Sequence, residues 1–280
     1  MIASADVVGA VRRHTPPALY PLARKIYRAI VAPIECWSID VVDRLLKRTY
    51  DGRVLPPALL RFKVRGSPSG EHFSSIGRQC ADDIAAALAA AGRPLATFRR
   101  ILDFGCGCGG ALLWLRDLAP KAALHGTDID ANAIAWCRRN LPYASFATNA
   151  ARPPLAYADA QFDLVYAISV FTHLDAGFER AWLAELRRVL APNGIALVTL
   201  HGPHSWNEMP AADQATLARD GFVFIRNDAS RGLFPDWYQT AFHSQSYVER
   251  TYAEFFDVLA YRPRAMNGHQ DVVLLRRRAE

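Results

Sequence analysis

The chain has 280 residues, of which 51% are hydrophobic and 21% are charged, a composition typical of a soluble globular protein with a large core. No apolar stretch approaches the roughly 20 residues that a transmembrane helix needs, and residues 1–14 lack the apolar segment of a secretory signal. The net charge is +6, but residues 1–65 alone carry twelve basic and five acidic side chains, so the basic character belongs to the N-terminal part.

The N-terminal part is predicted to be a helical extension covering residues 1–70. Pro33 is expected to break or start a helix, and the Pro56-Pro57 pair and residues 66–70 indicate loops. The basic extension could contact an anionic substrate, a nucleic acid or a membrane surface, or it could be a solvated helical face, which we favour. One or two helices are expected in residues 19–47, because apolar residues recur there near the helical period: Tyr20, Ile26, Ile30, Ile34, Trp37, Val41 and Leu45.

Strands and helices alternate after an alanine-rich helix that is predicted over residues 75–91. This alternation predicts an α/β fold with a parallel sheet and helices on both faces. The expected strands are 101–104, 122–127, 143–147, 162–168 and 194–200, and the expected helices are 109–118, 131–140 and 177–190.

The regular alternation of expected strands and helices ends after residue 200. Residues 202–252 are rich in aromatic side chains at irregular spacing, and we expect them to form a substrate-capping insertion. Two strands, 255–261 and 272–275, are predicted to close the chain. No linker divides residues 71–280, which we treat as one domain.

A glycine-rich turn follows the first expected strand. Gly105, Gly107, Gly109 and Gly110 come directly after the run 101–104. A strand that ends in such a turn and leads into a helix brings bare backbone up to a ligand. The spacing also fits the dinucleotide fingerprint, so the glycines alone do not identify the cofactor.

Two acidic residues help to decide between a nicotinamide dinucleotide and S-adenosylmethionine as the cofactor. Asp103 stands two residues before Gly105, where its carboxylate would repel a pyrophosphate and attract an ammonium group. S-adenosylmethionine carries an ammonium and a sulfonium and has no phosphate. Asp128 ends the next expected strand, where an acid can accept hydrogen bonds from both ribose hydroxyls of either cofactor. We therefore favour S-adenosylmethionine over a nicotinamide cofactor.

The cysteines do not suggest a metal site. Five are present, an odd number, and their spacing lacks metal-like pairs. Cys106 and Cys108 are best explained as small residues in the glycine turn. We expect no metal and a cytoplasmic location, where thiols stay reduced.

The segments 101–109, 126–130, 162–165 and 186–194 are four motifs in a fixed order. The same order is found in class I S-adenosylmethionine-dependent methyltransferases, and over residues 70–280 the chain resembles that family. The resemblance implies a seven-stranded, mostly parallel Rossmann-like sheet whose last strand is antiparallel. It implies that S-adenosylmethionine is bound, and that the chain is a methyltransferase.

The resemblance also implies positions for the cofactor. Asp103 and the glycines 105, 107 and 109 would lie near the methionine part, and Asp128 would bind the ribose. Ile129 would pack on the adenine and Asn149 would face its amino group. Ser169 would line the methyl-transfer site, and the segment from Phe73 to Gly77 would cover the carboxylate.

The acceptor is less well defined than the donor. Residues 169–173 lack the proline-containing motif of enzymes that methylate exocyclic amines of DNA bases. Candidate general bases are His173, His201 and His204, which follow the fourth and fifth strands of the domain. A structural role for each stays open.

A small-molecule acceptor, a secondary metabolite or sugar methylated at a hydroxyl or amine, is the leading hypothesis, with nucleic acid disfavoured. The alternatives are a non-catalytic cofactor-binding module, a nucleic-acid methyltransferase that uses the basic extension, and a nicotinamide oxidoreductase. The sequence leaves the oligomeric state open.

Overall fold

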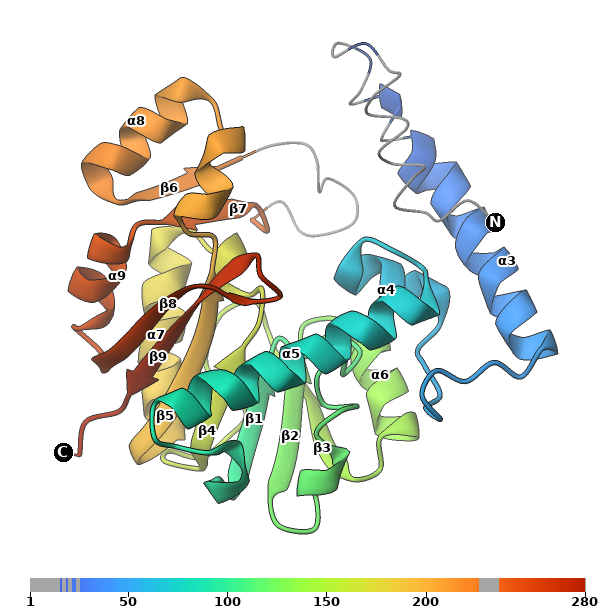
Figure 1. Cartoon of the computed structure of the whole chain (residues 1–280), viewed down its shortest axis with the longest axis horizontal. Coiled ribbons are helices and arrows are strands. Elements are labelled where there is room, and N and C mark those ends of the chain that lie inside the picture. The colour runs from blue at the N-terminus through green and yellow to red at the C-terminus, as the bar shows by residue number, and fades with distance from the viewer. Residues whose placement is uncertain (1–15, 17–18, 20–21, 24–25, 227–236, 280) are drawn as a thin grey trace. The chain divides into compact units, whose positions relative to one another are not determined.

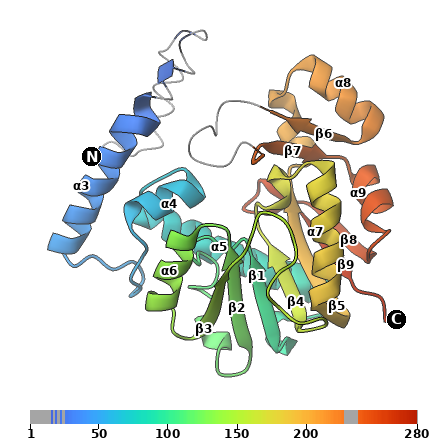
Figure 2. The same ribbon diagram turned by 180° about the vertical axis from the view of Figure 1, so that it is seen from behind.

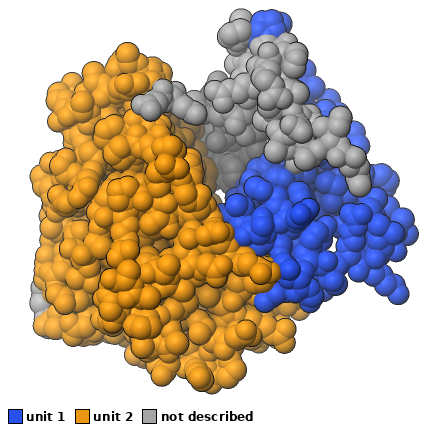
Figure 3. All heavy atoms as spheres, in the orientation of Figure 1, with its two compact units in different colours: residues 1–77, 227–235 blue, residues 78–226, 236–280 orange. Residues whose placement is uncertain are grey.

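A computed structural model describes residues 16, 19, 22–23, 26–226 and 237–279. The chain forms two compact units, which are coloured in Figure 3. The N-terminal unit comprises residues 1–77 and 227–235, and the sheet unit comprises residues 78–226 and 236–280. Within the described ranges, no helix is both long enough and apolar enough to cross a membrane.

The described part of the N-terminal unit contains the predicted helices, with a non-helical segment between α3 and α4. A π-helical turn, Tyr27–Val31, continues into α3, Ala32–Leu45, and Pro33 lies in the first turn of α3, directly after the π-helical turn. Helix α4, Ala58–Arg65, follows the expected proline loop. Helix α5, Gly70–Ala90, spans both units and begins five residues before the predicted start at residue 75.

The sheet unit contains the predicted seven-stranded sheet, in the order β3-β2-β1-β4-β5-β9-β8. The first five of these strands run parallel, β9 is antiparallel to β5, and β8 is antiparallel to β9. The strands are β1 (Arg100–Phe104), β2 (Ala123–Asp128), β3 (Ala144–Thr148), β4 (Phe162–Ala167), β5 (Leu190–Leu200), β8 (Asp257–Met266) and β9 (Gln270–Arg276).

Helices lie on both faces of this sheet, as predicted. Helix α5 crosses one face in Figure 1, and α7, Ala176–Val189, runs along the other face in Figure 2. Side chains alternate along a strand, so Leu102 and Phe104 of β1 share the α7 face, where Phe104 packs on Trp182. Asp103 therefore projects from the opposite face.

Helix α6, Ala131–Asn140, has the predicted bounds. Its first turn is capped by Asp130, whose side chain accepts hydrogen bonds from the N–H groups of Asn132 and Ala133. The helix packs on β2 and β3. The cap places the beginning of α6 directly after the end of β2.

The helix predicted at residues 109–118 is wrong. One helical hydrogen bond forms, from the N–H of Leu113 to the carbonyl of Gly109, but the next two N–H groups bond three residues back, and a short 3-10 turn, Arg116–Leu118, follows. Gly109 adopts a positive φ, and Pro120 comes soon after, so few residues remain to propagate a helix. Burial then decides the conformation: the segment encloses Leu112, Leu113 and Leu115, each at most 5% exposed.

Residues 202–252 are more regular than expected. They contain a 3-10 segment (Pro203–Glu208), α8 (Ala211–Asp220), β6 (Phe222–Ile225), β7 (Thr240–His243) and α9 (Gln245–Tyr252). Strands β6 and β7 pair as a separate two-stranded antiparallel sheet. The predicted aromatic segment therefore includes a small sheet of its own between the end of β5 and β8.

A buried polar cluster ties this insertion to α7. The side chains of Glu179 on α7 and His243 on β7 are fully buried, and Nε2 of His243 donates to Oε2 of Glu179 at 2.6 Å. The hydroxyl of Tyr247 on α9 donates to Oε1 of the same carboxylate at 3.0 Å. One carboxylate thus joins three elements.

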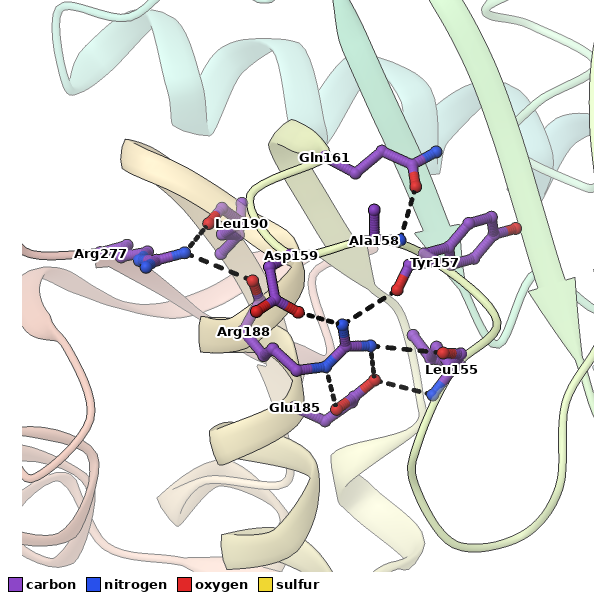
Figure 4. Close-up of polar contacts among 9 residues, drawn as sticks. All are labelled: Leu155, Tyr157, Ala158, Asp159, Gln161, Glu185, Arg188, Leu190 and Arg277. Carbon is purple, nitrogen blue, oxygen red and sulfur yellow. Dashed lines mark hydrogen bonds and ion pairs between the residues drawn. The ribbon is translucent and has the colours of Figure 1, made fainter.

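A second polar network holds the loop before β4 (Figure 4). The guanidinium of Arg188 donates to the carbonyls of Leu155 and Tyr157 at 3.3 and 2.9 Å, and it pairs with Glu185 and Asp159, each at 2.6 Å. Arg188 belongs to the predicted 186–194 motif. Its role in this motif is to fix the loop against the end of α7.

Candidate active site

The glycine turn is held against the end of β2. Gly105, Gly107 and Gly109 have φ values of +77°, +52° and +76°, which side chains rarely tolerate. The N–H groups of Gly105 and Cys106 both donate to the carbonyl of Thr127, at 2.8 and 3.0 Å. A Cβ atom on Gly105 would lie 2.3 Å from Cγ2 of Val170. The turn therefore needs glycine for both conformation and space.

Asp128 links the turn to the start of α6. Its Oδ2 accepts the N–H of Gly107 at 2.7 Å, and its Oδ1 accepts the N–H of Asp130 at 2.8 Å. A carboxylate offers about four acceptor positions, so each oxygen keeps one for a further donor. Burial raises the pKa of Asp128, and the two N–H groups act in the opposite direction.

Asp103 is a buried carboxylate next to the same turn. It is 3% exposed and is the register partner of Tyr166 on β4, so the two side chains project from the same face of the sheet. Burial, and then the charge of Asp103, raises the pKa of Tyr166. A carboxyl group is thus buried two residues before the first glycine.

Asn149 and Ile129 lie beside Asp128. The hydroxyl of Thr127 donates to Oδ1 of Asn149 at 2.8 Å, and the N–H of Asn149 donates to the carbonyl of Asp128 at 3.1 Å. The side chain of Ile129 is 37% exposed. The end of β2 therefore presents the apolar side chain of Ile129 next to the carboxylate of Asp128.

Ser169 follows β4 in a conformation that side chains seldom adopt. Its φ is +58°, and its N–H donates to the hydroxyl of Thr199 at 2.8 Å. Its Oγ lies 3.1 and 2.9 Å from the amide oxygen and nitrogen of Gln270 on β9. Strained backbone of this kind clusters at functional sites.

His173 and His201 come together after β4 and β5, with ring centroids 6.4 Å apart. Nδ1 of His173 lies 2.6 Å from the carbonyl of Gln239, and Nδ1 of His201 lies 3.2 Å from the carbonyl of Ala241. A carbonyl only accepts, so Nδ1 carries the proton in each ring and Nε2 holds the lone pair.

Tyr238 contacts one of these histidines. Its ring stacks on His173 at a centroid distance of 4.0 Å. Burial, and then the charge of Asp128, raises the pKa of Tyr238. The tyrosine therefore contacts a candidate base. Sequence reasoning identified it only as one aromatic residue of the insertion, and it did not identify Gln270 as a partner of Ser169.

A family model described as "Methyltransferase domain" matches residues 101–194, which run from β1 to the start of β5. The match begins at the strand that carries Asp103 and includes the glycine turn and Asp128. Residues 101–194 are an S-adenosylmethionine-dependent methyltransferase domain.

Curated relatives share this domain. A malonyl-[acyl-carrier protein] O-methyltransferase of Geobacter sulfurreducens is 32% identical over 155 residues, which are 55% of this chain and 56% of the relative. A fatty-acid O-methyltransferase of Mycolicibacterium smegmatis is 34% identical over 103 residues, or 36% of each chain. The chain thus matches about half of the first relative and about a third of the second.

A solved structure shows the same fold. An S-adenosylmethionine-dependent methyltransferase from Mesorhizobium loti superposes with a TM-score of 0.52 at 16% identity, covering 69% of this chain and 96% of that one. The likeness agrees with the sheet order described above.

The methyltransferase domain has the groups that its cofactor needs. The buried carboxylate of Asp103 suits an ammonium, and the unused acceptor positions of Asp128 suit ribose hydroxyls. The roles of Ile129, Asn149 and Ser169 stay predictions, although their positions beside the turn agree with them. Among the described residues, no group of three or more His, Cys, Asp or Glu side chains is placed to hold a metal ion.

The other predicted site residues lie elsewhere. His204 is in the 3-10 segment after β5, and its side chain is exposed. Phe73 and Gly77 are buried in the part of α5 that belongs to the N-terminal unit. Their proposed contact with the cofactor stays a prediction.

The paired side chains of His173 and His201 should be neutral at physiological pH. Burial lowers the pKa of His173 to about 4 and that of His201 to about 3. We expect two imidazole proton resonances that do not shift between pH 8 and about 5, in contrast to the ordinary histidine pKa of about 6.5. The resonances can be assigned from their loss in His173→Gln and His201→Gln.

The same pKa shifts predict how stability depends on pH. Because the unfolded chain binds these protons more readily than the folded chain, the free energy of unfolding should fall as the pH drops from about 6.5 towards 4. Urea unfolding at a series of pH values measures this slope. An equally steep slope in the double variant His173→Gln/His201→Gln would contradict the assignment.

Proposed function

We propose that the chain transfers the methyl group of S-adenosylmethionine to an oxygen atom of a small organic acceptor. The observation that carries the proposal is the pair of buried rings, His173 and His201, with Tyr238 stacked on His173 at a centroid distance of 4.0 Å. The carboxyl ends of parallel strands are where α/β proteins bind ligands. Asp128 ends β2, and His173 and His201 follow β4 and β5. Donor and acceptor groups would therefore share one site.

The bound cofactor supplies an electrophilic methyl group on a sulfonium. Methyl transfer forms the bond from the acceptor oxygen to the methyl carbon and breaks the carbon–sulfur bond, whose electron pair stays on sulfur. A hydroxyl acceptor also loses a proton. The lone pair on Nε2 of His173 or His201 can take that proton, because both Nδ1 atoms are held by carbonyls.

An oxygen acceptor is also favoured by the relatives, two of which are named as O-methyltransferases of malonyl-[acyl-carrier protein] and of fatty acids. The capping role predicted for residues 202–252 fits the contact of Tyr238 with His173. The corresponding role of residues 1–70 stays a prediction.

Transfer of a labelled methyl group tests the proposal. The chain is incubated with methyl-labelled S-adenosylmethionine and a panel of acids, alcohols and amines. We expect label in an oxygen-linked product, and alkaline hydrolysis then separates a methyl ester, which releases methanol, from a stable ether. Label that enters amines alone, or no transfer above the spontaneous loss of the methyl group, would contradict it.

Variants of the paired histidines test their part in this reaction. With a hydroxyl acceptor, His173→Gln or His201→Gln should lower kcat by at least about tenfold, because the proton acceptor is lost. S-adenosylhomocysteine binding should be unchanged. His204→Gln is the matched control, since this exposed ring lies outside the pair, and it should keep its rate. An equal kcat in the unmodified chain and in the three variants would exclude His173 and His201 as bases.

A further inference from the structure

Helix α3 and the turn before it carry their large apolar side chains on the outside. Ile30, Ile34, Trp37 and Leu45 are 57%, 61%, 68% and 75% exposed. Ile26, one turn before Ile30, is 48% exposed. Their spacing of three, four or eight residues places them along one face of the helix, which we call the outer face.

The acidic residues of α3 lie on the opposite side, against α4. Oδ1 of Asp40 accepts the N–H of Ala58 at 2.8 Å. Asp43 pairs at 3.1 Å with Arg61, whose side chain is only 2% exposed. Small apolar residues complete this inner face, which packs on α4: Ala32 and Cys36, with Tyr27 from the preceding turn.

This arrangement reverses the usual pattern of a surface helix. An isolated exposed isoleucine needs no explanation, but a row of five large apolar side chains along one helix face marks an interaction surface. The inner face shows that α3 already has its intramolecular partner in α4. The outer face is thus left for another surface.

Charge indicates the nature of that surface. Arg44 lies two turns after Trp37 on the same face, and Lys47 follows the helix; both side chains are exposed. Residues 1–65 carry twelve basic and five acidic side chains, and three of the acids are those of α3. Two of these, Asp40 and Asp43, bond to α4 residues, and the third, Glu35, accepts the hydroxyl of Tyr27 at 3.0 Å. The outer face is therefore apolar with basic residues at its end.

We propose that the outer face of α3 binds the surface of a membrane that contains anionic lipids, with α3 lying in the plane of the interface. A helix in this position buries one apolar face at the level of the headgroups and places basic side chains near the lipid phosphates. Trp37 suits the same depth, because its indole combines an apolar ring with a donor. A second copy of the chain would supply an apolar surface as well, but it would bring like charges together.

Vesicle sedimentation with the full chain tests the proposal. We expect binding to vesicles of phosphatidylcholine mixed with phosphatidylglycerol, weaker binding to phosphatidylcholine alone, and release as the salt concentration rises. The variant Ile34→Ser/Trp37→Ser/Leu45→Ser should reduce partitioning by at least about tenfold, because it removes most of the apolar contact. Arg44→Gln/Lys47→Gln should reduce binding to the anionic vesicles only.

A matched control variant tests whether vesicle binding depends on the outer face of α3 or on exposed apolar side chains in general. Val54→Ser/Leu59→Ser/Leu259→Ser also removes three exposed apolar side chains, but none from α3, and it should sediment like the unmodified chain. Circular dichroism verifies that each variant is folded. Equal vesicle binding by the two triple variants, no binding to any vesicle, or a dimer that light scattering detects and that the α3 variant dissociates would overturn the proposal.

Discussion

Replacing Asp128 with alanine is expected to weaken the binding of S-adenosylhomocysteine by about 100-fold or more. In the proposed site this carboxylate accepts both ribose hydroxyls, and a hydrogen bond to a charged group contributes about 1.5–3 kcal/mol. Two such bonds correspond to about two or more powers of ten in Kd. The variant also loses the acceptor that holds the N–H of Gly107 at 2.7 Å, so the turn is less well fixed.

Calorimetric titration measures this Kd, and Asp130→Ala is the matched control. Asp130 is two residues away and caps α6, so its loss should cost about 1 kcal/mol of stability and change the Kd little. Binding to the unmodified chain should also weaken in acid, because protonating Asp128 removes an acceptor and burial raises its pKa. Normal affinity in Asp128→Ala would remove this residue from the site.

The largest loss of stability is expected from Glu179→Ala, which should lower the free energy of unfolding by about 3–5 kcal/mol. The carboxylate is fully buried and accepts hydrogen bonds from Nε2 of His243 and the hydroxyl of Tyr247. Its removal leaves both donors buried without an acceptor, at about 1–3 kcal/mol each, and opens a cavity. Urea unfolding measures the change.

The exposed Glu254 provides the control for this prediction. It pairs with Arg180 at the surface, where its side chain is 50% exposed, so Glu254→Ala should change stability far less than Glu179→Ala. Glu179→Ala should also lose order in β7, because Glu179 holds the side chain of His243 on that strand. A Glu179→Ala protein as stable as the Glu254→Ala protein would show that the cluster does not anchor the insertion.

The strands of the sheet could be predicted because each core strand combines a short apolar run with a clear end. The apolar run 101–104 ends at Gly105, and the run 122–127 ends at Asp128. Asp103 and Asp128 could therefore be assigned to strand ends from spacing alone. The helix predicted after Gly109 failed because three buried leucines, rather than local propensity, decide that segment. Periodicity also predicted helix α3, but it could not show which side packs on α4.

The contacts between distant segments had no sequence signal. Ser169 meets Gln270 across 101 residues, and the carbonyl that holds His173 comes from Gln239, 66 residues later. The first pair depends on where β9 joins the sheet, and the second depends on where the insertion folds back over the end of β4. The cofactor side of the site is formed by adjacent parallel strands, and the sequence predicts it well. The side for the methyl acceptor is assembled from remote segments, and the sequence predicts it less well.

The most direct test of the account is calorimetric titration of the unmodified chain with S-adenosylhomocysteine and, separately, with NADH. The buried carboxylate of Asp103 beside the glycine turn predicts saturable binding of S-adenosylhomocysteine and much weaker binding of the pyrophosphate-containing NADH. Tighter binding of NADH, or no binding of S-adenosylhomocysteine, would contradict the account.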